Sequence, residues 1–218
     1  MRIKAIVFDL DGILIFPDFS LFIKAREEII NYLTSLGIII DDISSPFFKK
    51  VYDILHNEFG SNEIKIREIW IKISRIAERY EMQALRTAKI LPKCRELFSF
   101  IKSLSLKIAI WTMSCRRYAR EALKKLNIYD LVDILVSRDD FIRPKPYPDG
   151  LILICKKLNI KCDECIFIGD TELDIKAAKS AGVKPILYLR NDKKKQTLDC
   201  EVIEYLDVET LSRLISSP

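Results

Sequence analysis

Hydrophobic residues gather in short uninterrupted runs along the chain, and a polar residue closes most of them. The runs are Ala5–Phe8, Ile108–Trp111, Ile134–Val136, Cys165–Ile168 and Pro185–Tyr188. Apolar runs of this length are typical of strands that are buried on both faces of a parallel sheet. We therefore expect these segments to be the strands of one buried sheet.

Between the runs, hydrophobic residues recur at intervals of three and four positions, which is the spacing of one face of a helix. This pattern covers residues 93–104, 115–126, 148–158 and 172–181. Strands that alternate with helices form parallel sheets whose faces the helices cover. The sequence therefore predicts an α/β fold with a doubly wound parallel sheet.

Residues 17–86 interrupt this alternation, because they show helical periodicity and Ile38–Ile40 is their one strand-like run. A simple connection between two parallel strands needs far fewer residues. We therefore predict a helical domain inserted over residues 17–86 and a discontinuous core domain made of residues 1–16 and 87–218. The two junctions would lie at Pro17 and at Gln83–Pro92.

Composition fits a globular protein, since 218 residues with 49% hydrophobic side chains can bury a sizeable core. The hydrophobic run before the first aspartate is too short for a signal peptide. No segment approaches the ~18 uninterrupted apolar residues of a membrane helix. We expect a cytoplasmic protein with no membrane partner, as a monomer or a homodimer.

Charge and cysteine content add little to the functional picture. The net charge is +5, but the basic residues are dispersed, and the densest block is Lys193–Lys195 beside Asp192. We interpret that block as a solvated loop and expect no nucleic-acid partner.

The chain has six cysteines, and Cys162 and Cys165 form its one C-x-x-C pair. A zinc site would need a second pair or suitably spaced histidines, and His56 is the only histidine. We predict buried free thiols, with a disulfide as the less favoured alternative.

Polar residues stand where the predicted strands end. They are Asp9, Thr112, Ser137 and Asp170. Ligands of open parallel sheets bind beyond the carboxyl ends of the strands, so we expect these side chains to converge. Helix capping would explain one aspartate at each strand end. It does not explain a second aspartate at Asp11 or at Asp174.

The segment Gly169–Asp174 reads GDTELD, and its two aspartates are four residues apart. If a helix begins near Thr171, this spacing places both carboxylates on one side, and Gly169 allows the backbone to approach closely. Carboxylates gathered at one edge repel one another unless a cation joins them, and hard oxygen ligands suit Mg²⁺ better than zinc. The sequence therefore predicts a magnesium site.

Asp9 and Asp11 are two residues apart at the end of the first strand. Side chains with this spacing can reach one site at different depths, so one carboxylate can meet the reacting atom while the other reaches the leaving group. A carboxylate nucleophile beside a carboxyl acid/base is suited to attack on a phosphoryl group, which gives an aspartyl-phosphate that water then hydrolyses.

Positive charge and hydrogen-bond donors are also needed for the phosphoryl oxygens. Lys145 lies in a proline-framed segment, RPKPYPDG, which holds an extended backbone. Thr112 would either offer its hydroxyl to the phosphoryl group or simply cap the next helix. The amides of Met113 and Ser114 at the next helix start would add to a phosphate-binding site.

Together these motifs resemble the haloacid dehalogenase superfamily of phosphohydrolases. The chain carries D-x-D-G at Asp9–Gly12, an apolar strand that ends in Thr112, K-P-x-P-D at Lys145–Asp149 and G-D-x-x-x-D at Gly169–Asp174. They occur in the order and at the spacing of the family and span residues 7 to about 182. The resemblance implies a Rossmann-like core with a small helical cap, as in phosphoglycolate phosphatases and β-phosphoglucomutases.

The resemblance also implies a role for each matching residue. Asp9 would be the nucleophile, Asp11 the general acid/base, Thr112 the phosphate-binding hydroxyl and Lys145 the cation that steadies nucleophile and phosphate. Mg²⁺ would be held by Asp9, the main-chain carbonyl of Asp11, Asp170 and, directly or through water, Asp174. Ile13 departs from the threonine that many members have, which implies an altered loop environment rather than lost activity.

The leading functional hypothesis is a Mg²⁺-dependent phosphatase for a small phosphorylated metabolite, with phosphoglycolate the substrate that the resemblance favours. A phosphosugar mutase is less favoured, because similar mutases place a histidine soon after the first motif and His56 lies far along the insert. A phosphonate-cleaving enzyme would need a cap lysine such as Lys24. A non-catalytic binding protein would usually have lost a catalytic carboxylate, and none is missing.

Specificity would come from the inserted helices. A basic series at helical spacing is consistent with contact to an anionic substrate tail, but a solvated helix face is the favoured interpretation. The series is Arg67, Lys72, Arg75 and Arg79.

Overall fold

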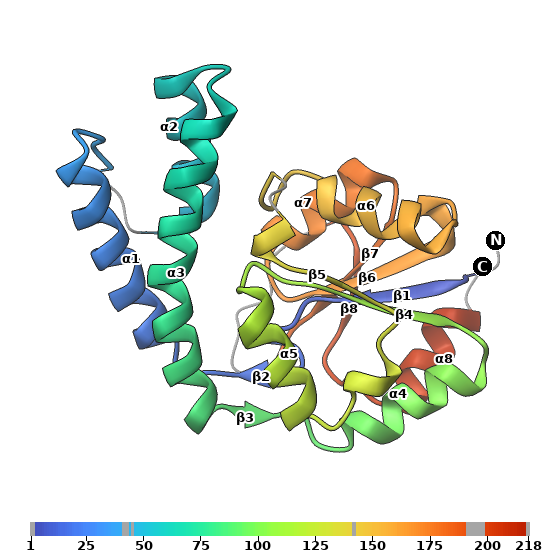
Figure 1. Ribbon diagram of the computed structural model, residues 1–218. Helices are drawn as coiled ribbons and strands as arrows, with labels where there is room; N and C mark the ends of the chain where they lie inside the picture. The colour runs from blue at the N-terminus through green and yellow to red at the C-terminus, as the bar shows by residue number, and fades with distance from the viewer. Residues whose placement is uncertain (1–2, 41–43, 45, 141–142, 191–198, 217–218) are drawn as a thin grey trace.

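The computed structural model describes residues 3–40, 44, 46–140, 143–190 and 199–216. A parallel sheet with helices on both faces forms the larger part of the molecule, and a group of long helices stands beside it (Figure 1).

The sheet has six parallel strands in the order β5-β4-β1-β6-β7-β8. Their bounds are β1 Ala5–Phe8, β4 Lys107–Trp111, β5 Ile134–Val136, β6 Cys165–Gly169, β7 Lys184–Tyr188 and β8 Glu201–Ile203. Each predicted strand is present, and the predicted doubly wound α/β fold is confirmed. β8 is an additional edge strand that the sequence pattern did not indicate.

The register of the central strands brings their carboxyl ends to one level. Phe8 on β1 is paired with Ile110 on β4 and with Ile168 on β6. The chain passes from β1 to β4 and β5 on one side and then returns to β6 on the other side. Such a reversal of winding direction creates the crevice in which ligands of this architecture bind.

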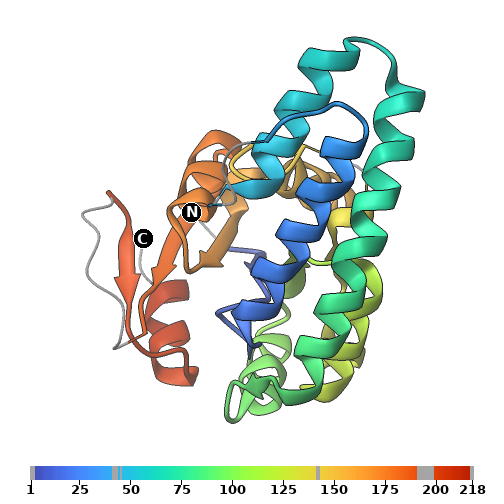
Figure 2. The same ribbon diagram turned by 90° about the vertical axis from the view of Figure 1, so that its left-hand side faces the viewer.

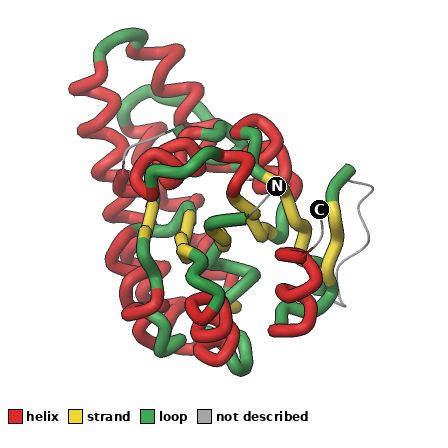
Figure 3. The backbone as a smooth tube through the Cα atoms, turned by 90° about the vertical axis from the view of Figure 1, so that its right-hand side faces the viewer, coloured by secondary structure: helices red, strands yellow, loops and turns green. Residues whose placement is uncertain are grey.

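The side-chain alternation of β1 explains why helices cover both faces. Ile6 and Phe8 face one side, where they join a core with α4 (Cys94–Ser103), α5 (Arg116–Lys125) and α8 (Val208–Ser216). Ala5 and Val7 face the other side, which α6 (Asp149–Leu158) and α7 (Glu172–Ala181) cover. Figure 3 shows these helices on either side of the strands. Three short 3₁₀ segments complete the core, namely η1 Tyr129–Leu131, η2 Arg138–Asp140 and η3 Cys162–Glu164.

The helices beside the sheet have a hydrophobic core of their own. They are α1 Phe19–Ser35, α2 Phe47–Phe59 and α3 Glu63–Thr87, and their buried residues include Ile29, Val51 and Ile73. Figure 2 shows them running side by side. We refer to α1, α2 and α3 with their connections as the cap. The division into domains at residues 17 and 86 stays a prediction.

Two structural details near the cap differ from the sequence pattern. Ile38–Ile40 forms no strand, because Ile38 and Ile40 instead pack on the cap core while Ile39 is exposed. The segments on either side of the cap pair as short antiparallel strands, β2 Ile15–Phe16 and β3 Lys89–Ile90. α3 itself continues through Gln83, where the second junction was expected.

All six cysteines are free thiols, as predicted. Four of them are buried, whereas Cys162 and Cys200 are half-buried. The lysine block at Lys193–Lys195 lies outside the described residues. None of the described helices is both long enough and apolar enough to span a membrane.

Candidate active site

The carboxyl ends of three neighbouring strands place the predicted residues around one point. The amide of Asp9, just after β1, donates to the carbonyl of Ile168 on β6 at 2.9 Å. Thr112 follows β4 and Asp170 follows β6. Ser137 follows β5, and its amide and hydroxyl donate to Asp140 Oδ2 at 2.8 and 3.2 Å.

Three carboxylates form an acidic cluster at this point. One oxygen from each of Asp9, Asp170 and Asp174 lies within 4.8 Å of the others. Asp174 is fully buried in the first turn of α7, where its Oδ2 accepts from the amide of Thr171 at 3.0 Å. Thr171 and Asp174 form a capping box, so local helix geometry fixes the Asp174 side chain.

Two glycines make the close packing of this cluster possible. Gly12 has φ +85°, and a Cβ atom there would lie 2.4 Å from Asp170 Oδ2. A Cβ atom at Gly169 would lie 2.2 Å from Cβ of Asp174. The glycines of the D-x-D-G and G-D-x-x-x-D motifs thus leave room for the carboxylates of Asp170 and Asp174, as expected for Gly169.

Lys145 is buried beside the acidic cluster. Its Nζ lies 2.7 Å from Asp174 Oδ1 and 3.1 Å from Asp9 Oδ1, and it donates to the carbonyl of Trp111 at 3.3 Å. Burial alone would lower the pKa of Lys145, but the two carboxylates outweigh it and raise the pKa above its ordinary value. The side chain is therefore a permanent cation at this position.

The surroundings of Asp9 disfavour its charged form, whereas those of Lys145 favour its charged form. Its pKa is raised well above the ordinary value, mainly by burial, and the charges of Asp174 and Asp170 raise it further while Lys145 lowers it. Lys145 by itself does not neutralise three carboxylates, and like charges gathered this closely favour a bound cation.

Asp11 lies close to this cluster but has different partners. Its carboxylate accepts hydroxyl groups from Tyr118 at 2.5 Å, Ser114 at 2.7 Å and Thr112 at 3.3 Å. Burial raises its pKa to about 6 against the opposing effect of the Tyr118 and Ser114 hydrogen bonds. A carboxyl group with a pKa in this range can both donate and accept a proton near neutral pH.

The loop Thr112–Cys115 carries three of the four predicted phosphate-binding residues, and Lys145 is the fourth. The amide of Ser114 donates to Thr112 Oγ1 at 3.0 Å, and the Ser114 hydroxyl faces Asp11. Met113 lines the cavity above Asp9. The loop therefore lies between the two aspartates of the first motif and the cap.

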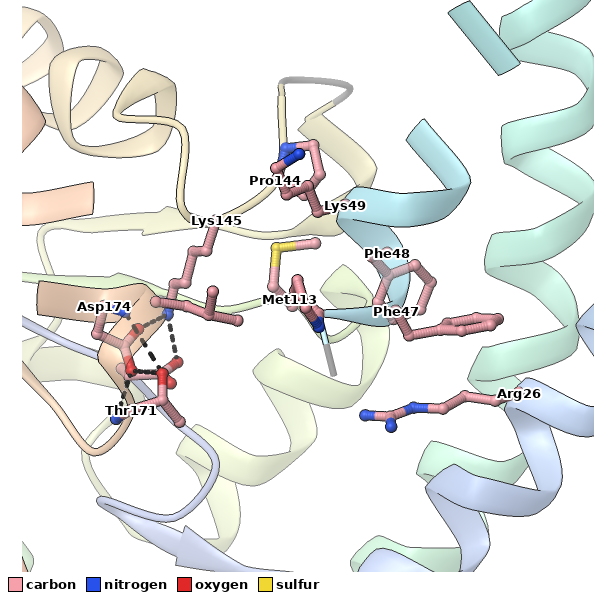
Figure 4. A pocket seen from close by; sticks show the side chains of 12 residues that line it. Arg26, Phe47, Phe48, Lys49, Met113, Pro144, Lys145, Thr171 and Asp174 are labelled. Carbon is pink, nitrogen blue, oxygen red and sulfur yellow. Dashed lines mark hydrogen bonds and ion pairs between the residues drawn. The ribbon is translucent and has the colours of Figure 1, made fainter. Parts of the chain in front are cut away.

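A cavity of about 150 Å³ opens between this site and the cap. Asp9, Lys145 and Asp174 line the core side, whereas Asp11 is not among its described lining residues. Arg26, Phe47, Phe48 and Lys49 line the cap side, and Figure 4 shows Arg26 extending from α1 toward this space. These cap residues were not predictable from the sequence, because their helical spacing is equally consistent with an ordinary cap core or a solvated face.

The cap residues that the sequence singled out lie elsewhere. The basic series of α3 is exposed and lines none of this cavity within the described residues, which favours the solvated-face interpretation. Its members are Arg67, Lys72, Arg75 and Arg79. Lys24 is exposed on α1, and His56 stacks on the ring of Tyr52 with centroids 3.9 Å apart. Neither lines the described part of the cavity.

The fold and the acid–lysine cluster at the sheet edge define a hydrolase built on a doubly wound sheet. The family model for haloacid dehalogenase-like hydrolases matches residues 3–182, and the chain belongs to this family. The resemblance that the motifs indicated is confirmed.

Named relatives narrow the enzyme class. A phosphorylated carbohydrates phosphatase of Thermotoga maritima is 25% identical, with 84% of this chain and 83% of that protein covered. A phosphoglycolate phosphatase of Shigella boydii is 22% identical, with 83% and 79% covered. A hydrolase from Pseudomonas syringae has a similar structure, with a TM-score of 0.69, 25% identity and coverage of 98% of this chain and 100% of that chain. The chain is a phosphatase of the haloacid dehalogenase superfamily, as predicted.

Proposed function

We propose that this phosphatase is Mg²⁺-dependent and hydrolyses a small phosphomonoester through an aspartyl-phosphate on Asp9. The observation that carries the proposal is the position of Asp9 at the core side of the cavity, between the cation of Lys145 and two further carboxylates. A nucleophile, a fixed positive charge and a set of hard oxygen ligands thus meet at one point.

The residues present fit Mg²⁺. The cluster offers carboxylate oxygens from Asp9, Asp170 and Asp174 within 4.8 Å of one another, and it carries more negative charge than Lys145 balances. Oxygen-only ligand sets with few protein groups are typical of Mg²⁺. The main-chain carbonyl of Asp11 would complete the set. When bound, the ion would supply positive charge that draws the phosphoryl oxygens toward Asp9.

Asp9 and Asp11 would divide the chemistry. A carboxylate oxygen of Asp9 attacks phosphorus, the bond to the ester oxygen breaks, and the departing oxygen takes the proton of Asp11 to leave as an alcohol. Asp11, now ionised, then removes a proton from water, which attacks the phosphorus and releases inorganic phosphate and free Asp9. For both steps the Asp11 side chain exchanges its hydroxyl partners for the reacting oxygen.

The remaining predicted residues would bind the phosphoryl oxygens. Lys145 would stabilise the charge that develops in the transition state, and its salt bridge to Asp174 holds its Nζ in place. The Thr112 hydroxyl and the amides of Met113 and Ser114 would donate to the same oxygens.

The cap side of the cavity favours a substrate with a second acidic group, of which phosphoglycolate is the simplest type. Arg26 is half-buried there, its guanidinium lies 5.6 Å from the ring centroid of Phe47, and burial lowers its pKa. A partly desolvated cation attracts an anion more strongly than an exposed one.

A comparison of two substrates of equal size tests this proposal. We expect kcat/KM with Mg²⁺ to be at least about tenfold higher for phosphoglycolate than for 2-hydroxyethyl phosphate, because one charge-assisted contact contributes about that factor. Arg26→Met should remove the difference and leave the rate with 2-hydroxyethyl phosphate unchanged. Equal efficiency for both esters in the wild-type enzyme would contradict the acidic-substrate assignment.

No observation favours the alternative functions. A mutase would use a cap histidine, but His56 does not line the described part of the cavity. A phosphonate-cleaving enzyme would use a cap lysine; Lys24 does not line the described part of the cavity, and Lys49, which does, is paired with Asp53. A binding protein without activity would not need the complete carboxylate set. The cytoplasmic location, the absence of nucleic-acid and membrane partners, and the monomeric or homodimeric state remain part of the proposal.

A further inference from the structure

A buried ion pair joins the cap to the core next to the proposed phosphate-binding loop. Glu81 lies on the cap helix α3 and Arg138 on η2, and they are 4% and 2% exposed. Arg138 NH1 and NH2 donate to Glu81 Oε1 and Oε2 at 2.5 and 3.2 Å. The two side chains therefore form a bidentate salt bridge inside the protein, although the residues are 57 positions apart in the sequence.

This pair holds three successive main-chain groups of the loop. Arg138 NH1 donates to the carbonyl of Met113 at 2.7 Å, and the Arg138 amide donates to the carbonyl of Ser114 at 3.1 Å. Glu81 Oε2 accepts the amide of Cys115 at 3.0 Å. Each residue from Met113 to Cys115 thus has a backbone group fixed by one member of the pair.

Because the peptide unit is planar, these contacts fix the direction in which the Ser114 amide points. The carbonyl of Met113 and the amide of Ser114 belong to one planar peptide unit and point in opposite directions. With the carbonyl held by Arg138, the amide faces the other way, toward Thr112 Oγ1 at 3.0 Å. That side of the loop is the one on which the Ser114 hydroxyl meets Asp11.

The same arginine also contacts the cap side of the cavity. Its Cζ lies 4.9 Å from the ring centroid of Phe48, which lines the cavity with Asp9. Its Nε donates to Ser74 Oγ at 3.1 Å, and Ser74 in turn donates to Asp139 Oδ1 at 2.7 Å. Arg138 therefore links the cap helices and the loop into one polar network.

Stability alone is a weak reason for such a pair, because the loss of hydration offsets most of the attraction between two buried charges. We propose that Glu81 and Arg138 are positioning residues that hold the Thr112–Cys115 loop in the geometry needed for phosphoryl transfer. The proposal rests on the proposed function, since it assigns the loop to the phosphoryl oxygens. Neither residue touches the substrate in this account.

The test is orthovanadate inhibition of 4-nitrophenyl phosphate hydrolysis with Mg²⁺, measured at a temperature well below each variant's melting point. Vanadate mimics the transferring phosphoryl group, and its inhibition constant does not depend on the fraction of protein that is active. We expect Glu81→Gln to raise this constant about tenfold or more and to lower kcat about 10–100-fold, because small displacements of catalytic groups have effects of this size. Arg138→Lys should act in the same way, and it carries the test if Glu81→Gln does not fold.

Asp133→Asn is the matched control. Asp133 also accepts a backbone amide, from Ile108 at 2.8 Å, and pairs with Lys102 at 2.7 Å, but it stands at the opposite end of the sheet from the loop. We expect it to lower the melting temperature with kcat and the vanadate constant within about twofold of the wild type.

Two results would overturn the positioning role. One is a folded Glu81→Gln or Arg138→Lys variant whose vanadate constant is unchanged, and the other is an equal change in Asp133→Asn. If the wild-type enzyme hydrolyses the ester and Asp9→Asn does not, such a result removes this inference alone. A wild-type chain without phosphatase activity would overturn the proposed function and this inference with it.

Discussion

Gly12→Ala tests the acidic cluster without altering any charged group. Gly12 has φ +85°, which a residue with a Cβ atom rarely adopts, and a Cβ atom there would lie 2.4 Å from Asp170 Oδ2 and 2.9 Å from its Cγ. Two separate costs follow from one methyl group. The first is backbone strain and the second is displacement of the Asp170 carboxylate.

The structure sets the size of both costs. Backbone strain for a non-glycine residue at positive φ is about 1–2 kcal/mol, which corresponds to a decrease of roughly 2–8 °C in melting temperature. Ordinary contact begins at 3.4 Å, so the Asp170 carboxylate must move by about 1 Å. The end of a side chain can move without much loss of stability. A side chain that binds a metal cannot move in this way without weakening the binding, and changes around metal ligands typically lower metal affinity about 10–100-fold.

Gly37→Ala is the matched control, because Gly37 has φ +78° and a Cβ atom there would have no atom within 4 Å. We expect both variants to lose similar stability in thermal unfolding monitored by circular dichroism. In Mg²⁺ titrations of phosphatase activity, only Gly12→Ala should need about 10–100-fold more Mg²⁺ for half-maximal rate.

The reasoning is refuted if Gly12→Ala reaches its half-maximal rate at the wild-type Mg²⁺ concentration while it is as destabilised as Gly37→Ala. That result would show that Asp170 is not a ligand or that its position is unimportant. An equal increase in the Mg²⁺ requirement of Gly37→Ala would show that strain alone, and not the displaced carboxylate, affects the site.

Three further predictions concern other parts of the molecule. Lys145→Ala should lower kcat about 10²-fold or more, whereas Lys24→Ala should not change it; steady-state kinetics with 4-nitrophenyl phosphate decides this. Gly150→Ala should destabilise the fold despite a better helix residue, because its Cβ would lie 2.2 Å from the Trp111 indole; thermal unfolding should show a net loss, since overpacking of about 1–3 kcal/mol exceeds the ~1 kcal/mol gain in helix propensity. Burial would raise the pKa of Asp133, but its cationic and amide partners hold it below its ordinary value. Its contribution to stability is present above about pH 4 and is lost as the pH falls through the lower pKa of the folded state, so Asp133→Asn should destabilise the protein at pH 7 and have little effect near pH 2 in urea unfolding.

The main elements of the sheet were predictable from short apolar runs, because helices cover both faces of the sheet and successive side chains of a central strand are therefore all buried. The strand-end rule also anticipated the meeting of Asp9 and Asp170, and the four-residue helical spacing added Asp174. Ser137 also follows a strand, but its described hydrogen bonds go to Asp140 and not to the acidic cluster. The rule thus predicts which strand ends lie at one edge but not which partner each polar side chain takes.

The cap side of the site was not predictable from one sequence. Arg26 lines the cavity and Arg75 does not, although both lie on amphipathic helices. Only the tertiary packing, of α1 and α2 on α3 and of α3 on α5 and η2, selects the side chain that faces the site. The pairing of Glu81 with Arg138 was hidden for the same reason, since each residue alone resembles an ordinary surface charge.

The central claim is that Asp9 carries the phosphoryl group and Asp11 moves the protons. Intact-mass spectrometry after rapid quenching with 4-nitrophenyl phosphate and Mg²⁺ tests it most directly. Asp11→Asn should accumulate one phosphoryl group and hydrolyse slowly, because an aryl leaving group needs little protonation, whereas Asp9→Asn should show none. A phosphoryl-enzyme in Asp9→Asn, or wild-type steady turnover in Asp11→Asn, would contradict this division of roles.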